Sequence, residues 1–225
     1  KDVSVIPLIG YVIVDAFRGL GIRHEETWTG DLLNMGYAVN YNSEDTVTPD
    51  MLAHYDVFIV SAAGYMYRPE ELLTIRDYVQ NGGGLLLLGS SNWFTYSAIT
   101  RFAGLPWANV TGAWWGGETT NVTQHQITEG GRKIFVTDIL PRSQIVPSPP
   151  GIGIICDSVG LNEVEVAVSE VQAGRVVCVS DVNMFSDSFI GYSNNRKLAS
   201  NVVNWLARVK HEHEVVVHIE TPTHV

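Results

Sequence analysis

Short apolar runs, each closed by turn residues and followed by a helix-like segment, dominate the first part of the chain. Residues 9–14, 57–60 and 85–88 are such runs. A strand that is buried on both faces reads as a continuous apolar run, and parallel strands need a crossover connection, usually a helix, between them. This order therefore predicts an α/β fold, a mostly parallel doubly wound sheet with helices on both faces. The four leucines of residues 85–88 are expected at the centre of the sheet.

The clearest helix signal begins at Pro69, because proline suits the first helical position. Glu70 and Glu71 then place negative charge at the positive end of the helix dipole. The glycine run 82–84 ends the helix. Its expected buried stripe consists of Leu72, Ile75 and Val79. Further helices are expected at about residues 25–35, from the Thr48-Pro49 pair onward, and at about 195–210.

The regular pattern dissolves between residues 104 and 131, where Trp114 and Trp115 stand among small and polar residues. We therefore expect an irregular, Trp-rich insertion there. Strand patterns return at residues 152–156, 164–168 and 175–179, and the alternation in 164–168 favours a half-exposed antiparallel strand.

The domain is expected to occupy residues 1–210. Residues 211–225 are polar at first and then alternate through Val215, Val217 and Ile219. Because a lone strand is unstable, this segment is predicted to be either a tail or the start of a following β-rich domain.

Composition excludes several classes of protein. The 225 residues carry a net charge of −10, so no basic surface that would bind nucleic acid is expected. No apolar run approaches the roughly 20 residues that span a bilayer, so no membrane insertion is expected. The two cysteines, Cys156 and Cys178, make no disulfide framework, and the sequence leaves open whether they pair.

Weaker signals indicate whether the chain belongs to a longer polypeptide and where it is located. It opens at Lys1 without Met or a signal peptide, which suggests a segment of a longer polypeptide. Asn109 and Asn121 each begin an N-glycosylation sequon. These sequons favour an extracellular or cell-surface location, and the sequence leaves their glycosylation open.

Four segments, taken in order, resemble the class I glutamine amidotransferase-like superfamily in its flavodoxin-like form. They are residues 55–60, 70–88, 125–130 and 174–187. The likeness covers about 200 residues, and the order and spacing of the motifs carry it, since each motif alone is unspecific. The resemblance implies a flavodoxin-like fold.

Within that superfamily the chain is most similar to the domain that follows the catalytic domain of site-1-protease-type subtilisins. The shared features are residues 36–39, 92–94, the Trp pair 114–115 ahead of glycines, and 174–177. A more distant likeness is the non-catalytic domain of an intraflagellar-transport subunit. The resemblance implies an accessory domain of a larger, secreted subtilisin-like serine protease.

The residues that carry amidotransferase chemistry are replaced in this chain. Active members place a Cys nucleophile on a turn after a central strand and a His and Glu after a later strand. Here the turn holds Ser90 and Ser91, and the later position falls at Asp181 and Asn183. Asn accepts no proton at neutral pH, and a carboxylate is a poor base for a serine hydroxyl. We therefore expect this degenerate site to be non-catalytic and to need no cofactor.

A serine hydrolase is the alternative from the enzyme class. Ser90 or Ser91 would pair with His24 or His125 as nucleophile and base. A hydrolase elbow reads Gly-x-Ser-x-Gly, whereas bulky Trp93 stands here in place of the closing glycine. The alternative is that both serines have only a structural role in the turn.

Oxygen-bearing side chains should gather where the parallel strands end. Asp15 closes the first strand, and Asp181, Asn183 and Asp187 follow the last. Doubly wound folds bind ligands at this end, and such oxygens suit Ca²⁺ or Mg²⁺. The same residues commonly cap turns and helices. No metal is therefore expected, and Asp15, Asp181 and Asp187 are weak candidates.

Aromatic residues concentrate in the loops, which is typical of a contact surface. They are Trp93, Phe94, Trp107, Trp114 and Trp115. Equally, the loop could fold onto the sheet with its aromatics in a small core of their own. The binding candidates are Trp93, Trp114, Trp115, Asp15 and Asp187.

The sequence as a whole favours a non-catalytic accessory or docking domain. Its expected partner is another domain of the same polypeptide, and a separate protein or a glycan is a further option. The alternatives are the serine hydrolase and a carbohydrate- or metal-binding module.

Overall fold

The computed structural model describes residues 7–19, 26–109, 116–137, 143–157 and 163–208. Its centre is a nine-stranded sheet in which five parallel strands lie in the order β2-β1-β3-β4-β11. This is the flavodoxin-like strand order. The five strands are β1 (Gly10–Asp15), β2 (Tyr37–Asn42), β3 (Val57–Ser61), β4 (Gly84–Leu88) and β11 (Gly174–Val179).

Antiparallel strands extend the sheet beyond β11. β10 (Val164–Val171) pairs with β11, and it also pairs with β9 (Ile152–Cys156) and β8 (Ser143–Ile145). β5 (Trp107–Asn109) pairs with β8 at the far edge. A separate two-stranded sheet joins β6 (Gly117–Thr119) to β7 (Ile134–Val136).

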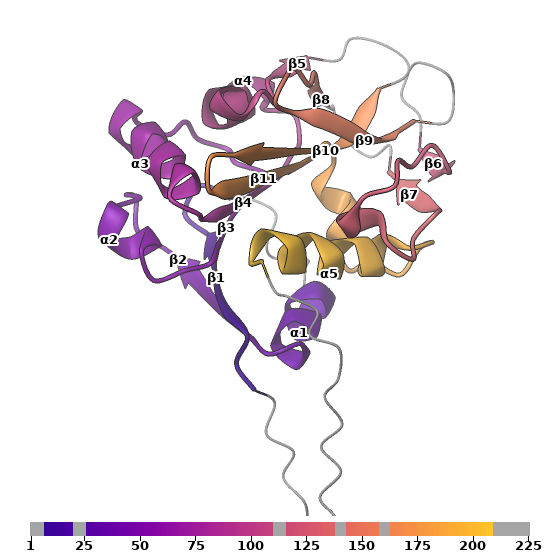
Figure 1. Cartoon of the computed structure of the whole chain (residues 1–225), viewed down its shortest axis with the longest axis horizontal. Helices are drawn as coiled ribbons and strands as arrows, with labels where there is room; N and C mark the ends of the chain where they lie inside the picture. Colours follow the sequence, from indigo (N-terminus) through magenta and orange to yellow (C-terminus); the bar gives the residue numbers. More distant parts are fainter. Residues whose placement is uncertain (1–6, 20–25, 110–115, 138–142, 158–162, 209–225) are drawn as a thin grey trace, which may run out of the picture.

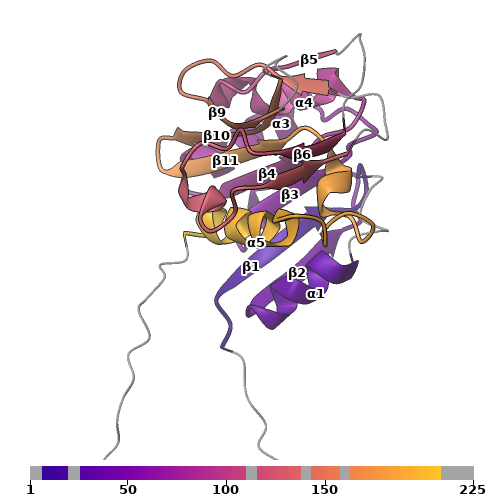
Figure 2. The same cartoon turned by 90° about the vertical axis from the view of Figure 1, so that its right-hand side faces the viewer.

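Helices cover both faces of the sheet (Figure 1). One face carries α2 (Pro49–Leu52), α3 (Pro69–Gln80) and α4 (Trp93–Thr100), and the other carries α1 (Glu26–Asn34) and α5 (Asn195–Leu206). Figure 2 shows α1 and α5 side by side on their face. Short 3₁₀ turns are η2 (Arg101–Ala103), η3 (Gln126–Thr128) and η4 (Val182–Phe185).

Two hydrophobic cores result, one on each face. Alternate residues of a strand point to opposite faces, so Leu86 and Leu88 enter the core under α5 while Leu85 and Leu87 enter the core under α3 and α4. All four leucines are fully buried. The predicted central position of this strand is confirmed, since β4 lies between β3 and β11.

Most predicted elements are confirmed, with small shifts at their ends. The Thr48 hydroxyl caps α2 by accepting the Met51 N–H at 3.2 Å. In α3, Ile75 and Val79 are buried as expected, but Leu72 is only partly buried and Glu71 takes a buried place.

The expected half-exposure of β10 was wrong, and the expected irregular segment contains short regular pieces. β10 is antiparallel as predicted, but Glu165 and Ser169 are buried, and the apolar side chains of this strand enter both hydrophobic cores. Residues 104–131 also contain regular pieces, namely β5, β6 and η3. These pieces have three residues each, too few for any periodic pattern to show.

The cysteines are free and lie on strands separated by β10. Burial raises the pKa of the Cys178 thiol to about 12. Residues 211–225 lie outside the described residues, so the predicted boundary at residue 210 stays a prediction. No helix in the described ranges is long and apolar enough to cross a membrane.

Candidate functional site

The strands β1, β3, β4 and β11 end at one side of the sheet, which we call the carboxyl end. β2 lies on one side of β1 and β3 on the other, so the chain reverses its winding between β1 and β3. Doubly wound folds bind ligands at such a switch point. The loops that follow these strands therefore form the first place to look for a site.

Asp15 closes β1 and is completely buried at this switch point. Its Oδ1 accepts the backbone N–H groups of Phe17 and Arg18 at 3.1 and 3.3 Å. Its Oδ2 accepts the Tyr67 hydroxyl at 2.5 Å and lies 3.5 Å from the Arg18 guanidinium. Burial, and then the Asp15 charge, raise the pKa of Tyr67 well above its usual value, so Tyr67 stays a neutral donor.

Arg18 links Asp15 to a second buried carboxylate. Its Nη2 donates to Glu71 Oε1 at 2.6 Å and also to the Asp45 carbonyl oxygen. Glu71 additionally accepts the N–H of Val47 at 2.9 Å and that of Arg68 at 2.7 Å. Arg18, Tyr67, Asp15 and Glu71 thus form one buried network, and its carboxylates are occupied by partners of the chain itself.

Sequence reasoning did not identify the link between Glu71 and Asp15 through Arg18. It assigned Glu71 only to the helix dipole, and the long-range contact with Arg18 leaves no local pattern. One signal was present, because a Glu at the third helical position commonly accepts the N–H of the N-cap residue. Glu71 does this with Arg68.

The turn after β3 corresponds to the loop that could supply backbone donors to an anion. The Ala62 N–H donates to the Leu88 carbonyl and the Gly64 N–H to the Arg18 carbonyl, each at 2.8 Å. Ala62 also has a left-handed φ of 43°. These two amides therefore stabilise the loops and are not available as oxyanion donors.

The turn after β4 has the strand–turn–helix order of a nucleophile elbow without its backbone strain. Ser90 is partly exposed and Ser91 exposed, and α4 follows at once. Neither serine has the left-handed φ of a strained turn. Gly89 is fixed by its neighbours, since an added Cβ would lie 2.5 Å from the Trp107 ring.

The histidines of the described residues, His54 and His125, lie at the opposite end of the sheet. The His125 ring packs on Trp205, with 5.1 Å between centroids. The next residue of α5 touches Gly84, which starts β4. Ser90 comes six residues later, about 20 Å along an extended strand. The structure therefore does not bring His125 to the serines, and His24 lies outside the described residues.

Asp181 and Asn183 form a turn with each other after β11. Asp181 Oδ1 accepts both the backbone N–H and the side-chain amide of Asn183 at 2.9 Å, and the Thr137 hydroxyl donates to Oδ2. Asp181 thereby caps η4. This is the capping role that Asp commonly takes at turns.

Asp187 lies elsewhere and caps α1. Its two carboxylate oxygens accept the N–H groups of Thr27 and Glu26 at 2.7 and 3.2 Å. Asp15, Asp181 and Asp187 therefore serve three separate parts of the fold. Within the described ranges, no three His, Cys, Asp or Glu side chains are grouped so that they could hold a metal ion.

The aromatic candidates divide into buried and exposed residues. Trp107 is buried against Tyr96, with 5.0 Å between ring centroids, and belongs to the core. Trp93 and Phe94 begin α4 on the surface and pack edge to face at 5.7 Å. Trp114 and Trp115 lie outside the described residues.

Three loops at the carboxyl end expose large apolar side chains. Phe17 follows β1, Tyr65 and Met66 follow β3, and Trp93 and Phe94 follow β4. Their exposed fractions run from 37% for Trp93 to 64% for Tyr65. We call these five residues the carboxyl-end patch. Sequence reasoning missed Phe17, Tyr65 and Met66, although each stands just after a buried strand.

The loops that carry the patch are bonded to one another. The Gly64 N–H joins the β3 loop to the β1 loop, and the Asn92 side-chain amide donates to the Ala63 carbonyl at 3.1 Å. These bonds join the three loops that carry the patch.

Solved structures share the fold at low sequence identity. The N-terminal domain of mmIFT52 matches with a TM-score of 0.74 at 14% identity, covering 90% of this chain and 99% of that chain. A ThuA-like protein of Bacteroides uniformis matches with a TM-score of 0.60 at 12% identity, covering 92% of this chain and 94% of that one. The flavodoxin-like fold is therefore shown. The first match also agrees with the distant likeness seen in the sequence.

The same fold occurs within a longer enzyme. An exo-β-1,4-mannosidase of an Opitutaceae bacterium matches with a TM-score of 0.57 at 16% identity, covering 90% of this chain and 36% of the enzyme. No family model matches the chain, and no curated protein matches it in sequence.

Proposed function

We propose that this chain is a non-catalytic, glutamine amidotransferase-like docking domain of a larger, secreted subtilisin-like serine protease. Its partner is another part of the same polypeptide, and the carboxyl-end patch is the surface that binds it. One observation carries the proposal. The loops at the carboxyl end expose apolar side chains, while the carboxylates at the switch point are bonded to Arg18 of the same chain.

The filled switch point argues against a small polar ligand. Such a ligand needs free donors or acceptors, whereas Asp15 and Glu71 are bonded to Arg18 and to backbone amides. Displacing Arg18 would leave two buried carboxylates unpaired, which is strongly unfavourable.

The patch has the chemistry of a protein contact. Aromatic residues and Met are enriched at protein interfaces, and charged residues are depleted at interface cores. Because the three loops are bonded together, little conformational entropy is lost when a partner covers Phe17, Tyr65 and Phe94.

The parent protein is inferred from the sequence resemblance to site-1-protease-type subtilisins. A fold of this kind also forms about a third of the mannosidase chain, so its use within longer polypeptides has a precedent. Tethering raises the effective concentration of the partner to about the millimolar range, so a patch of modest size suffices within one polypeptide.

A photo-crosslinking experiment on the intact polypeptide tests the proposal. p-Benzoylphenylalanine replaces Phe94, and the matched control replaces Glu70, which is exposed on α3 outside the patch. We expect position 94 to crosslink to another domain of the same polypeptide and position 70 to give no such product. Absence of products from position 94, or equal products from both positions, contradicts the proposal.

A further inference from the structure

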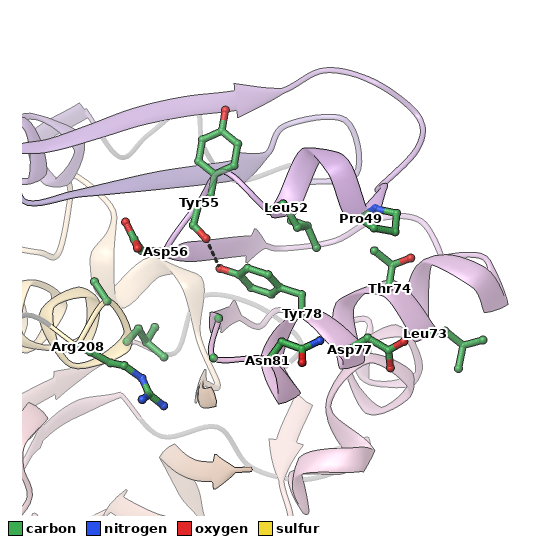
Figure 3. A pocket seen from close by; sticks show the side chains of 15 residues that line it. Pro49, Leu52, Tyr55, Asp56, Leu73, Thr74, Asp77, Tyr78, Asn81 and Arg208 are labelled. Carbon is green, nitrogen blue, oxygen red and sulfur yellow. Dashed lines mark hydrogen bonds between the residues drawn. The ribbon is translucent and has the colours of Figure 1, made fainter. Parts of the chain in front are cut away.

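A pocket of about 540 Å³ lies at the amino end of the sheet, away from the carboxyl-end patch. It is bounded by α2, by α3 and by the end of α5 (Figure 3). Its volume falls within the range of pockets that bind small molecules. The side chains that decide its character are Leu52, Asp56, Leu73, Tyr78 and Arg208.

The wall of this pocket is apolar and held in place. Tyr78 extends across it, and its hydroxyl donates to the Tyr55 carbonyl at 3.2 Å. An added Cβ on Gly83 would lie 2.3 Å from the Tyr78 ring, so the ring is in close contact with the backbone there. Leu52 is buried, and Leu73 is 50% exposed at the mouth. Because the Tyr78 hydroxyl is already bonded, the wall offers an aromatic ring and aliphatic side chains to an occupant.

Asp56 brings a negative charge to the pocket. Its Oδ2 accepts the Tyr11 N–H at 2.8 Å, but a backbone N–H is neutral and leaves the charge in place. Among the described residues, no Lys, Arg or His side chain pairs with it. Burial, and then the Asp56 charge, raise the pKa of Tyr78, so this charge acts on the wall of the pocket. Asp77 differs, because its carboxylate lies 3.0 Å from the Arg76 guanidinium and is paired.

Two helices add negative potential at the same place. α3 and α5 have 12 residues each and both end at the pocket, where Asn81 follows α3 and Leu206 closes α5. Neither helix has a basic residue in its last turn. The carboxyl end of a helix carries about half a negative elementary charge. Together with Asp56 these ends exceed the opposing charge of Arg208, the basic residue among the described lining residues, by about one elementary charge.

We propose that the amino-end pocket binds a small organic cation, an ammonium group carried on an apolar body. The ammonium group lies against the Tyr78 ring on the side of Asp56, and the apolar body packs on Leu52 and Leu73. An aromatic ring attracts a cation to its face, and the carboxylate adds direct Coulomb attraction. This inference goes beyond the proposed function, which uses the opposite end of the sheet, and either can fail without the other.

Three ligands of similar size and different charge test the preference on the full chain. 2-Phenylethylammonium, 2-phenylethanol and phenylacetate share a phenyl ring, and NMR titration at low ionic strength measures the Kd of each. We expect the ammonium ligand to bind roughly tenfold more tightly than the alcohol, and phenylacetate to bind most weakly. Equal affinities, tighter binding of phenylacetate, or no saturable binding of the ammonium ligand overturns the inference.

Charge variants test the assignment to this pocket. Asp56→Asn keeps an oxygen for the Tyr11 N–H but removes the charge, so we expect the ammonium ligand to bind roughly fivefold more weakly. Glu70→Gln is the matched control, because it removes the same charge from an exposed position of α3 outside the pocket and should leave the Kd unchanged. Arg208→Gln should tighten binding. Equal losses in Asp56→Asn and Glu70→Gln, or weaker binding in Arg208→Gln, overturn the inference.

A further variant separates the pocket from the carboxyl-end patch, whose exposed aromatic rings also attract cations. Trp93→Ala removes one of these rings, and we expect it to leave the Kd of the ammonium ligand unchanged. Loss of binding in Trp93→Ala would place the ligand at the patch and would overturn the inference.

Discussion

The two ends of one sheet use opposite arrangements of charge and apolar surface. At the carboxyl end, charges are buried and paired around Arg18, while apolar side chains such as Tyr65 and Phe94 face solvent. At the amino end, the apolar wall lies inside a pocket and the carboxylates of Asp56 and Asp77 stand at its rim.

This difference shows that one sheet can carry buried, paired charges at one end and a pocket with an apolar wall at the other. The switch point is still present, but its carboxylates Asp15 and Glu71 are bonded to Arg18, Tyr67 and backbone amides of the chain itself. What the described loops of the carboxyl end offer is a set of exposed apolar side chains. The amino end, which doubly wound folds do not ordinarily use, keeps the open pocket.

The largest effect is expected from Arg18→Ala, which disrupts the buried network of the carboxyl end. Removing the guanidinium leaves Asp15 and Glu71 buried without their cation, and breaking a buried pair in this way costs about 3–5 kcal/mol. Urea unfolding followed by circular dichroism measures the change in the free energy of unfolding.

The matched control for Arg18 is Arg68→Ala. Arg68 pairs with Asp45 on the surface, and exposed pairs contribute little. An Arg18→Ala variant as stable as Arg68→Ala would break the comparison, because the carboxyl end would then not depend on its buried charges.

Substitutions of two tryptophans at the carboxyl end compare the hydrophobic core with the carboxyl-end patch. Trp107→Ala removes a buried ring that packs on Tyr96 and donates to Thr100 at 3.2 Å, so we expect a loss of about 3–5 kcal/mol. Trp93→Ala acts on the surface and should stay within about 0.5 kcal/mol of the unaltered chain. Thermal and urea unfolding of both variants measure this difference, and similar losses would mean that the patch belongs to the core.

A glycine pair tests how tightly the loops at the switch point are held. A Cβ on Gly19 would lie 2.6 Å from the Asp15 carbonyl and 2.7 Å from the Ser61 carbonyl, so Gly19→Ala should cost about 1–3 kcal/mol through overpacking. Gly30 lies within α1 with nothing near its Cβ position, so Gly30→Ala should stabilise by about 0.5–1 kcal/mol. Opposite signs in urea unfolding are the expected outcome, and a neutral Gly19→Ala would show loops that yield easily.

The smallest effect concerns His125 at the amino end. Burial lowers the pKa of His125, so near pH 6 the unfolded chain binds more protons than the folded one. Stability should therefore fall as pH drops through the ordinary histidine value near 6.5. His125→Gln should lose less stability than the unaltered chain between pH 7.5 and 5.5 in urea unfolding. His54→Gln, at an exposed position, is the control, and an equal fall in all three proteins contradicts the prediction.

The sequence predicted the parallel half of the fold well because its signals are local. Four leucines in a row indicate a buried strand, and Pro69 indicates a helix start, and each of these patterns spans only a few residues. The antiparallel half was predicted less well. Glu165 on β10 reads as exposed, yet it is buried and accepts the Ser180 hydroxyl, a partner that only the folded sheet supplies.

The candidate site shows the same limit. Sequence placed Asp15 at the correct end of the sheet, but its partner Tyr67 is 52 residues away and forms no motif with it. Such partners of a site residue can be recognised only when the long-range contacts of the folded chain are known.

The most direct test of the account treats the chain with a fluorophosphonate probe and records its intact mass. We expect no adduct at neutral pH, because neither Ser90 nor Ser91 has an imidazole beside it among the described residues. A stoichiometric adduct that disappears in Ser90→Ala or Ser91→Ala would contradict it and would place a working nucleophile at the carboxyl end.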